Sequence, residues 1–268
     1  MEVRETFRSL DGWLHYARSG KLISLDGIKD LGAQMTKAGA IEPLTNHVIP
    51  PQAWTIGHGW REGLAWGGVN SRTRAVMAVI QDILGENLDP RIYAAEGITG
   101  FALRLRGLYP RFIGSEYTDD PVRREQMFPV PFEDLHALSF GDNLFDIVST
   151  NEVLEHIPSI DQALSELCRV LKPGGWHVGT HPFAMMQEDS VVRTMIENGK
   201  LVHVMEPEYH GNPMSEQGSL VFEIPAWDIL KRARAAGFSD AFMRYVISKK
   251  HACLADQVGG IFVLCCQK

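Results

Sequence analysis

The pattern of hydrophobic and polar positions changes near residue 70. Before this point, apolar residues at helical spacing predict two short helices, at 6–19 and 25–38. A stretch rich in proline, glycine and tryptophan follows them. We define residues 1–70 as an N-terminal accessory region, and we expect it to cover the functional site.

The pattern of the main domain, 71–268, is regular. Segment 71–84 is typical of an amphipathic helix, with Asn70 or Ser71 as its N-cap and Gly85 as its end. Apolar and amphipathic segments then alternate, which predicts a parallel sheet wrapped by helices, with an antiparallel strand at the end. Segment 184–225 breaks this alternation, and we interpret it as an insert on the substrate side. The expected strands are 92–95, 111–116, 144–150, 176–183, 241–248 and 260–268, and the expected helices are 101–108, 160–171 and 226–238.

Composition excludes several classes of protein. Lys and Arg number 26 against 33 Asp and Glu, for a net charge of -7, and the longest basic run is Lys249-Lys250. A nucleic-acid partner is therefore not expected. The first residues, MEVRETFRSLDGW, carry charges where a signal peptide needs an apolar stretch, and no apolar run approaches ~18 residues. We expect a cytoplasmic protein without a membrane partner.

The cysteines give no sign of a metal centre. Cys168, Cys253, Cys265 and Cys266 lack the spacing of zinc ligands, and the adjacent pair lies in an apolar strand pattern. We interpret all of them as reduced core residues, and we expect no metal site.

The turn after the first expected strand is a candidate ligand site, because ligands of open α/β sheets bind at the carboxyl ends of the strands. It contains Glu96, Gly97, Thr99 and Gly100. Two glycines let a backbone approach a ligand closely, and the following helix offers free N–H groups. A turn that needs glycine only for its backbone angles explains the same residues.

Glu116 ends the second expected strand, about twenty residues further on. A carboxylate at this place can accept hydrogen bonds from both ribose hydroxyls of a nucleotide-like cofactor. A strand-end glutamate that is merely solvated is the alternative.

Four short motifs follow one another within 133–183. They are Asp134-Leu135, then Phe-Asp-Ile-Val at 145–148, then Leu154-Glu155-His156, then Arg-Val-Leu-Lys-Pro-Gly-Gly at 169–175. Pro173-Gly174-Gly175 should end a helix and form a tight turn into the next strand. In this order and spacing the series resembles the second half of class I S-adenosylmethionine-dependent methyltransferases, in particular those with a methyltransferase domain of type 11. At the level of the fold, the resemblance covers residues 92–268.

This resemblance implies a Rossmann-like, doubly wound sheet of seven strands, mostly parallel with an antiparallel last strand. It also implies S-adenosyl-L-methionine as the cofactor. Asp134 would accept a hydrogen bond from the adenine amino group, and Leu135 would pack on the ring. The expected cofactor-binding residues are Glu96, Gly97, Thr99, Gly100, Glu116, Tyr117, Asp134, Leu135 and Asn151.

The first turn departs from the family pattern acidic-x-Gly-x-Gly-x-Gly. Ala94 stands at the acidic position, and Glu96 and Ile98 stand at two glycine positions. The chain is similar to a subgroup of bacterial methyltransferases, often found near glycan-assembly genes, with a Thr-Glu-x-x-Thr turn, a Gly-Ser-Glu-Tyr strand end and a Pro-Glu-Tyr-His-Gly-Asn-Pro insert. The matching segments here are 96–99, 114–117 and 207–213. This similarity implies a remodelled but working turn in which Glu96 reaches the methionine end of the cofactor; loss of cofactor binding is the alternative.

Within the insert, Glu208, Tyr209 and His210 place a carboxylate, a phenol and an imidazole side by side. Such a loop is typical of a lid that contributes acid–base groups, and a turn held by Tyr and His hydrogen bonds is the alternative. His210 is the first candidate for a catalytic base, followed by His156 and His181, because imidazole titrates near neutral pH.

The leading hypothesis is O-methylation of a sugar or another small hydroxylated metabolite. The Asn/Asp-Pro-Pro-Tyr turn of base and amine N-methyltransferases is missing, since 151–154 reads Asn-Glu-Val-Leu, and the Pro-Cys nucleophile of cytosine C5 enzymes is also missing. Two alternatives stay open: a cofactor-binding or regulatory protein without turnover, and N- or C-methylation of a small metabolite. The acceptor and the oligomeric state do not follow from the sequence.

Overall fold

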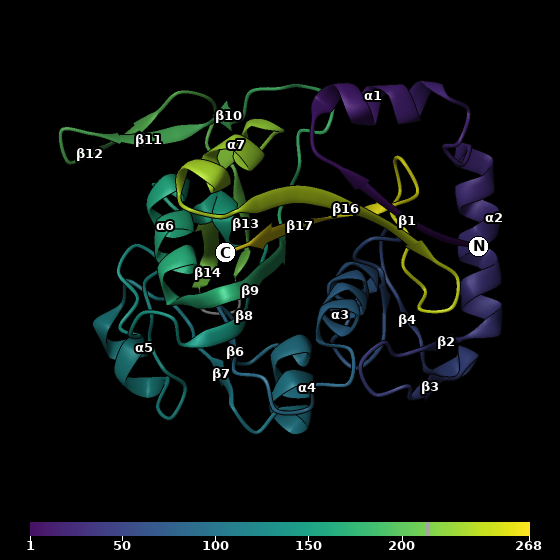
Figure 1. Cartoon of the computed structure of the whole chain (residues 1–268), viewed down its shortest axis with the longest axis horizontal. Helices are drawn as coiled ribbons and strands as arrows, with labels where there is room; N and C mark the ends of the chain where they lie inside the picture. Colours follow the sequence, from purple (N-terminus) through teal and green to yellow (C-terminus); the bar gives the residue numbers. More distant parts are fainter. Residues whose placement is uncertain (213–214) are drawn as a thin grey trace.

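A computed structural model describes residues 1–212 and 215–268. Its centre is a seven-stranded sheet in the order β1-β16-β17-β9-β8-β6-β7 (Figure 1). The predicted doubly wound α/β fold is therefore confirmed. The strands of this sheet are β1 (Glu2–Phe7), β6 (Ile92–Ala94), β7 (Phe112–Gly114), β8 (Phe145–Asn151), β9 (Leu171–Thr180), β16 (Asp240–Ser248) and β17 (Ile261–Gln267).

Strand direction divides the sheet into two parts. β6 pairs in parallel with both β7 and β8, and β8 pairs in parallel with β9. β17 is antiparallel to β9 and to β16, which confirms the predicted antiparallel last strand and places it inside the sheet. The accessory region adds the antiparallel edge strand β1, paired with β16. The sequence pattern did not predict this strand, because half of the residues in 2–7 are charged and exposed, which leaves only Val3 and Phe7 as apolar positions.

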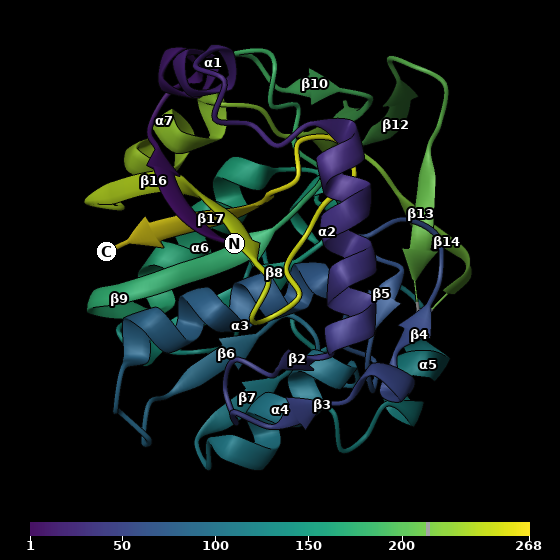
Figure 2. The ribbon, with the colours of Figure 1, turned by 90° about the vertical axis from the view of Figure 1, so that its right-hand side faces the viewer.

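Helices cover both faces of the sheet. The helices α3 and α4 lie on one face, and α1, α6 and α7 lie on the other (Figures 1 and 2). The side chains of Asn70 and the backbone of Gly85 delimit α3 as predicted, because Asn70 accepts from the Thr73 amide and Gly85 adopts a positive φ of 56°. The helices are α1 (Leu10–Arg18), α2 (Leu25–Ala38), α3 (Ser71–Leu84), α4 (Gly100–Leu108), α5 (Pro121–Gln126), α6 (Ile160–Val170) and α7 (Asp228–Ala235).

The central strands are buried on both faces, so they consist of continuous apolar runs. Alternate residues of β17 enter opposite cores: Phe262 and Leu264 pack with α6 and α7, whereas Ile261 and Val263 pack with α3. The adjacent Cys265 and Cys266 follow the same alternation, and all four cysteines are buried and free. The interpretation of the cysteines as core residues is confirmed.

The motif at 169–175 does not form the expected turn. The helix α6 ends at Val170, Leu171 is already extended, and residues 171–180 run as one strand. Gly174 lies within this strand with a φ of 79°, and the β8–β9 register shifts between Phe145 and Ile147. The glycines therefore allow an irregular strand start, and the helix passes into the strand without a loop.

Segment 184–225 forms short antiparallel strand pairs that stand away from the main sheet (Figures 1 and 2). The 3-10 turn η2 (Leu154–His156) follows β8 in the chain. It is hydrogen-bonded to the end of this insert, through Leu220 and Phe222. The pairs are β10 (Val191–Val192) with β15 (Glu223–Ile224), β11 (Thr194–Glu197) with β12 (Lys200–His203), and β13 (Tyr209–Asn212) with β14 (Ser215–Leu220); in the accessory region β2 (Ala40–Ile41) pairs with β3 (Val48–Ile49), β4 (Thr55–Ile56) pairs with β5 (Leu64–Ala65), and η1 (Pro51–Ala53) lies between them.

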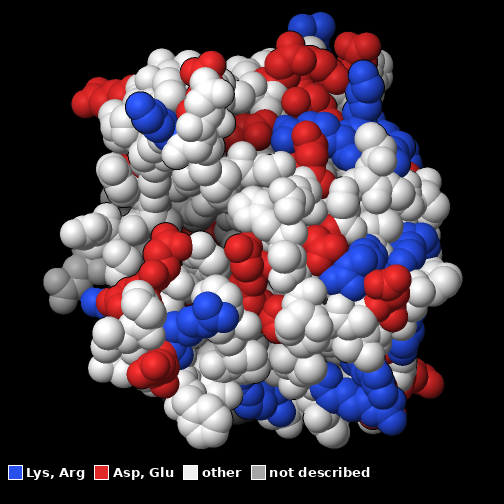
Figure 3. All heavy atoms as spheres, turned by 90° about the vertical axis from the view of Figure 1, so that its left-hand side faces the viewer, with Lys and Arg blue, Asp and Glu red and all other residues white. Residues whose placement is uncertain are grey.

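The surface carries mixed charge. On the face seen in Figure 3, Lys and Arg side chains lie near Asp and Glu side chains, and areas of uncharged residues separate these groups. In the described part of the chain, every helix is too short or too polar to cross a bilayer.

One buried cation joins the accessory region to the main domain. Arg74 in α3 is 0% exposed and donates hydrogen bonds to the carbonyl groups of Leu64, Val69, His251 and Ala252, at 2.8–3.0 Å. Burial lowers the pKa of its guanidinium to about 10. Its donors satisfy backbone acceptors from segments that are far apart in sequence, so this side chain positions the start of α3.

We expect Arg74→Met to lower the free energy of unfolding by about 3–5 kcal/mol, because it leaves several buried carbonyl groups without a donor. Chemical denaturation measures this loss. The exposed Arg18→Met on α1 is the matched control and should change stability by less than about 0.5 kcal/mol. Equal effects of the two substitutions would contradict the role of Arg74.

Candidate active site

A buried carboxylate links the carboxyl ends of β6 and β8. Glu96 follows β6, is 8% exposed, and accepts a hydrogen bond from Asn151 Nδ2 at 2.6 Å. The hydroxyl of Thr99, which is also the N-cap of α4, binds the same carboxylate. Burial raises the pKa of Glu96, and the hydrogen bonds from Thr99 and Asn151 oppose this shift. The turn is therefore built around Glu96, at a position where the family pattern has glycine.

One carboxylate oxygen of Glu116 binds the backbone of the turn. Its Oε1 accepts hydrogen bonds from the amides of Gly97 at 2.8 Å and Ile98 at 3.2 Å. Burial raises the pKa of Glu116, and these backbone donors oppose the shift. Glu116 and Ile98 also line a cavity of about 420 Å³ together with Met127 and Val130. This volume falls in the range of small-molecule sites, roughly 300–1,000 Å³.

The two glycines of the turn are required by close packing between protein segments. A Cβ on Gly100 would lie 2.6 Å from the carbonyl oxygen of Gly67, and a Cβ on Gly97 would lie 3.2 Å from the Gly114 backbone. Neither glycine has a positive φ. The explanation from backbone angles alone is therefore wrong, and Gly100 lets the accessory region approach the turn.

Asp134 and Tyr117 lie beyond the buried part of the turn. Asp134 Oδ1 accepts from the His136 amide at 2.8 Å, which caps a local turn, and its side chain is 39% exposed. Tyr117 is half exposed and donates its hydroxyl proton to Asp119 Oδ1 at 2.5 Å. Leu135 is buried in the core. The adenine contacts of Asp134 and Leu135 stay predictions.

An ion-pair network lies just past β8. Glu152, with a positive φ of 53°, binds Arg61 Nη2 through Oε1 at 2.8 Å, and Arg72 Nε lies 3.8 Å from the same oxygen. Arg72 also donates to Thr180 Oγ1 at the end of β9, at 3.1 Å. Burial opposes ionisation of Glu152, but Arg72 and Arg61 outweigh it and lower the pKa of Glu152 to about 2. The accessory region therefore supplies one cation, Arg61, to the carboxyl edge of the sheet, and the start of α3 supplies the other, Arg72.

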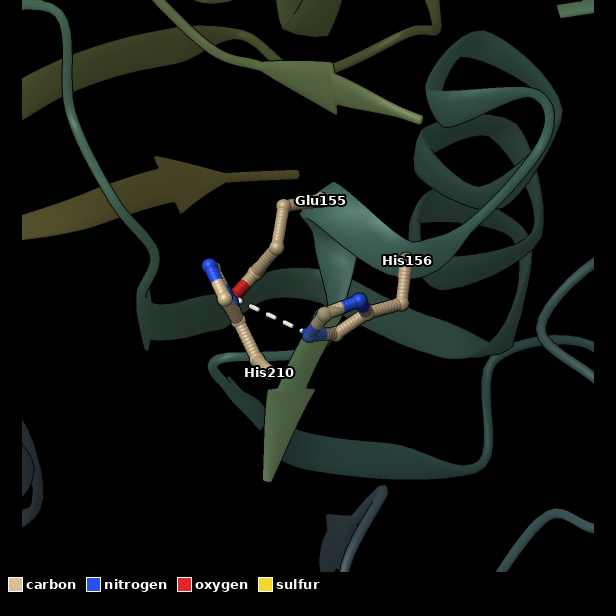
Figure 4. Close-up of side chains that lie close together, drawn as sticks. All are labelled: Glu155, His156 and His210. Carbon is tan, nitrogen blue, oxygen red and sulfur yellow. Dashed lines mark ion pairs between the residues drawn. The ribbon is translucent and has the colours of Figure 1, made fainter. Parts of the chain in front are cut away.

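The cluster of Glu155, His156 and His210 occupies the other side of this edge, and the three side chains point toward one another (Figure 4). Glu155 Oε1 lies 3.5 Å from His156 Nε2 and 3.7 Å from His210 Nδ1. His210 Nε2 contacts Glu208 Oε1 at 3.1 Å. Glu155 and Glu208 raise the pKa of His210 to about 9, against the effect of burial. A ring protonated in this way donates hydrogen bonds, and it must lose its proton before it can act as a base.

The other predicted acceptor-side residues are placed as follows. Tyr209 is exposed, on the face of β13 opposite His210. Glu208 pairs with Arg193 at 3.1 Å as well as with His210. His181, just past β9, is buried, and burial lowers its pKa. Pro213, the last residue of the insert motif, lies outside the described residues.

Sequence reasoning missed Glu152, Glu155, Arg61 and Arg72 as members of the site. Glu155 stands inside the Leu-Glu-His motif, and its place between β8 and a histidine was the available signal. Arg61 and Arg72 come from the accessory region and the start of α3, so only the folded chain brings them to Glu152.

Residues 102–179 match a protein family described as a methyltransferase domain. The ubiquinone/menaquinone biosynthesis C-methyltransferase UbiE of Laribacter hongkongensis is 49% identical over 49 residues, 18% of this chain and 20% of that protein. An uncharacterized chloroplastic methyltransferase of Arabidopsis thaliana is 29% identical over 159 residues, 52% of this chain and 44% of that protein. The chain thus spans about a fifth of the length of the UbiE relative.

Among solved structures, an S-adenosylmethionine-dependent methyltransferase from Mesorhizobium loti is 14% identical, with a TM-score of 0.46, over 72% of this chain and 98% of its own. The sheet order, the motif series at 133–183 and the family match together define the class: the chain carries a class I S-adenosylmethionine-dependent methyltransferase domain.

The residues of the turn fit that cofactor. Within the described residues, Asn151 Oδ1 is a buried acceptor without a hydrogen-bond partner, and both hydrogen bonds that Glu116 accepts there go to Oε1, which leaves Oε2 for a hydroxyl donor. Both atoms lie next to the turn that Glu96 and Gly97 form. An ammonium group can satisfy Asn151 and Glu96, and ribose hydroxyls can satisfy Glu116.

We expect Glu152→Gln to lower the free energy of unfolding at pH 7 by about 2 kcal/mol, because the partly buried Arg61 and Arg72 lose one of their two carboxylate partners and keep only Glu62. The folded pKa of about 2 lies below the unfolded value, so this stabilisation is complete above about pH 5 and is lost as the pH falls toward 2. Thermal unfolding from pH 3 to 8 should therefore show that the difference in Tm between Glu152→Gln and the wild type becomes smaller at low pH. The exposed Glu86→Gln should show no such difference, and a constant difference for Glu152→Gln would refute the assignment.

Glu116→Ala should weaken binding of S-adenosylhomocysteine by about 30- to 100-fold, because it removes two charge-assisted hydrogen bonds and loosens the turn. Calorimetry measures the dissociation constant. Glu125→Ala, on the exposed side of the neighbouring α5, is the control and should bind as wild type does. An unchanged constant for Glu116→Ala would remove this residue from the site.

Proposed function

We propose that this chain transfers the methyl group of S-adenosyl-L-methionine to a hydroxyl of a sugar or another small metabolite. The methyltransferase domain supports the transfer itself. The observation that carries the choice of acceptor is the cluster of Glu155, His156 and His210 at the carboxyl end of β8, close to the cofactor turn. Polar, proton-accepting groups at this position suit a hydroxyl acceptor.

The residues divide into two sides. Glu96, Glu116 and Asn151 would hold the cofactor, which supplies an activated methyl group when bound. On the other side, His210 and His156 would orient the acceptor hydroxyl, and His210 would accept the hydroxyl proton in those molecules whose His210 ring is neutral. Holding the acceptor in line is the larger part of the task, because alignment removes most of the entropic cost of a bimolecular step.

The hairpin β13–β14 supports this division. The Phe222 amide donates to the Glu155 carbonyl at 2.7 Å, and His156 Nδ1–H donates to the Leu220 carbonyl at 2.9 Å. These bonds tie the end of β14 to η2, so His210 of the insert is fixed beside the carboxyl end of the parallel strands. A small acceptor bound between insert and turn would be screened from bulk water.

Methyl transfer to carbon is the second candidate function. The similarity to UbiE, named as a C-methyltransferase, favours it, although it covers only 49 residues. An acceptor carbon needs the same proton removal when it carries an acidic hydrogen, so the histidine cluster serves either reaction.

The test is a transfer assay with S-adenosylmethionine carrying a carbon-13 methyl group. Pools of sugars, nucleotide sugars and phenolic metabolites are offered as acceptors, and the carbon-13 chemical shift of the product separates O-, N- and C-methyl groups. A signal in the O-methyl region supports the proposal, and a C-methyl signal favours the second candidate. Tight binding of S-adenosylhomocysteine with no transfer to any pool would favour a binding protein without turnover.

His210→Ala should lower kcat by about 10²–10⁴-fold, as expected for loss of a base that also orients the acceptor, while the affinity for S-adenosylhomocysteine stays within about twofold. Steady-state kinetics and calorimetry measure the two quantities. Tyr209→Phe, on the opposite face of the same strand, is the control and should keep kcat. A parallel loss of cofactor affinity and thermal stability in His210→Ala would mean that the histidine is structural.

A further inference from the structure

The cluster of Glu155, His156 and His210 has the composition of a metal centre. It combines two imidazoles with one carboxylate, and one potential ligand atom from each residue lies within 4.8 Å of the others (Figure 4). Glu155 Oε1 is 3.5 Å from His156 Nε2 and 3.7 Å from His210 Nδ1. Ligand atoms about 2.1 Å from a tetrahedral ion are separated by roughly 3.4 Å, so the cluster needs only small side-chain shifts to bind one.

Each imidazole is oriented from behind by an acceptor. His156 Nδ1–H donates to the Leu220 carbonyl at 2.9 Å, and His210 Nε2–H donates to Glu208 Oε1 at 3.1 Å. In the neutral rings, the remaining nitrogens, His156 Nε2 and His210 Nδ1, therefore carry lone pairs that face Glu155. Histidines that ligate metals almost always donate their other N–H to a carbonyl or a carboxylate in this way.

Glu155 supplies an independent observation. Its side chain is 0% exposed, and within the described residues neither carboxylate oxygen has a hydrogen-bond partner. A buried carboxylate without hydrogen-bond donors costs several kcal/mol, and the cost falls when a cation faces it, either a protonated His210 or a metal ion that displaces that proton. One imidazole nitrogen of His156 and one of His210 lie 3.5 and 3.7 Å from Glu155 Oε1. Glu208, which could contribute further negative charge, is engaged by Arg193 at 3.1 Å.

We propose that Glu155, His156 and His210 bind one divalent first-row transition ion such as Zn²⁺, Fe²⁺ or Mn²⁺. Two nitrogen ligands and one oxygen ligand suit such an ion, whereas Mg²⁺ and Ca²⁺ prefer sites made of oxygen alone. Three protein ligands leave at least one coordination position open to water or to an oxygen of a small molecule. The inference concerns metal binding and does not depend on methyl transfer, and it revises the expectation from cysteine spacing that no metal site is present.

The test uses tag-free, full-length protein dialysed against a chelator, with Co²⁺ as the probe. Calorimetry and the visible absorption of Co²⁺ should report one bound ion per chain, displaced by Zn²⁺. His210→Gln and Glu155→Gln should each lower the Co²⁺ affinity by at least about 100-fold, and Glu208→Gln by about 10- to 100-fold. His15→Gln, an exposed histidine on α1, is the matched control and should bind Co²⁺ as wild type does.

Thermal unfolding without metal shows whether each variant is folded, and His210→Gln keeps the test valid if the buried Glu155→Gln does not fold. Absence of stoichiometric Co²⁺ binding to the wild-type chain would overturn the inference, and so would undiminished binding by folded His210→Gln. S-adenosylhomocysteine binding is measured on the same samples. Binding of S-adenosylhomocysteine without Co²⁺ binding would contradict the metal site and leave the proposed function standing. Binding of Co²⁺ without S-adenosylhomocysteine binding would support the metal site and contradict the proposed function.

Discussion

The carboxyl edge of the central sheet holds two buried carboxylates, Glu96 and Glu155, and the partly buried Glu152, and the organisation of the site depends on how each one is compensated. An ionised group without a partner in the protein interior costs several kcal/mol. Glu96 is compensated by hydrogen bonds from Asn151 and Thr99, and Glu152 by two arginines. Glu155 has no hydrogen-bond donor among the described residues, and its side chain lies 3.5 and 3.7 Å from nitrogens of two imidazole rings. The three carboxylates thus have different partners, namely neutral hydrogen-bond donors, arginines and imidazoles, so residues on one edge of the sheet differ in charge and in the groups they can bind.

This constraint explains why the accessory region belongs to the functional unit. Arg61 reaches Glu152 from that region, and Gly67 packs against Gly100 at the start of α4 so closely that a Cβ does not fit. The same region adds β1 to the sheet. Removing it would leave Glu152 short of a cation and the cofactor turn without cover. A domain boundary at residue 70 describes the sequence pattern, whereas the packing is continuous across it.

The insert has a corresponding role on the other side of the edge. Its strand β13 carries His210, and its strand β14 gives the carbonyl that orients His156. The acceptor side therefore consists of one turn from the sheet and one hairpin from the insert. A change in the length or sequence of the insert would alter the acceptor side while the cofactor turn, held by Glu96 and Glu116, stays as it is.

The sequence by itself determined the doubly wound fold, because apolar strands and amphipathic helices of sufficient length alternate from Asn70 to the end. It also determined the cofactor class, because the motif series at 133–183 is local and ordered. It did not determine the edge strand β1, whose charged residues gain their stability from pairing with β16. Nor did it determine the irregular start of β9, where register and not turn chemistry sets the backbone.

In the site, too, some residues could be predicted from the sequence and others only from the folded chain. Glu96, Thr99 and Glu116 were predicted to lie together, and they do, because they follow strands whose carboxyl ends meet at one edge of a parallel sheet. The cations of Glu152 and the meeting of Glu155 with His210 join residues that are 55 or more positions apart, and no local pattern encodes such contacts. Only the tertiary structure decided them, because the folding of the accessory region and the insert onto the sheet edge is a matter of long-range packing.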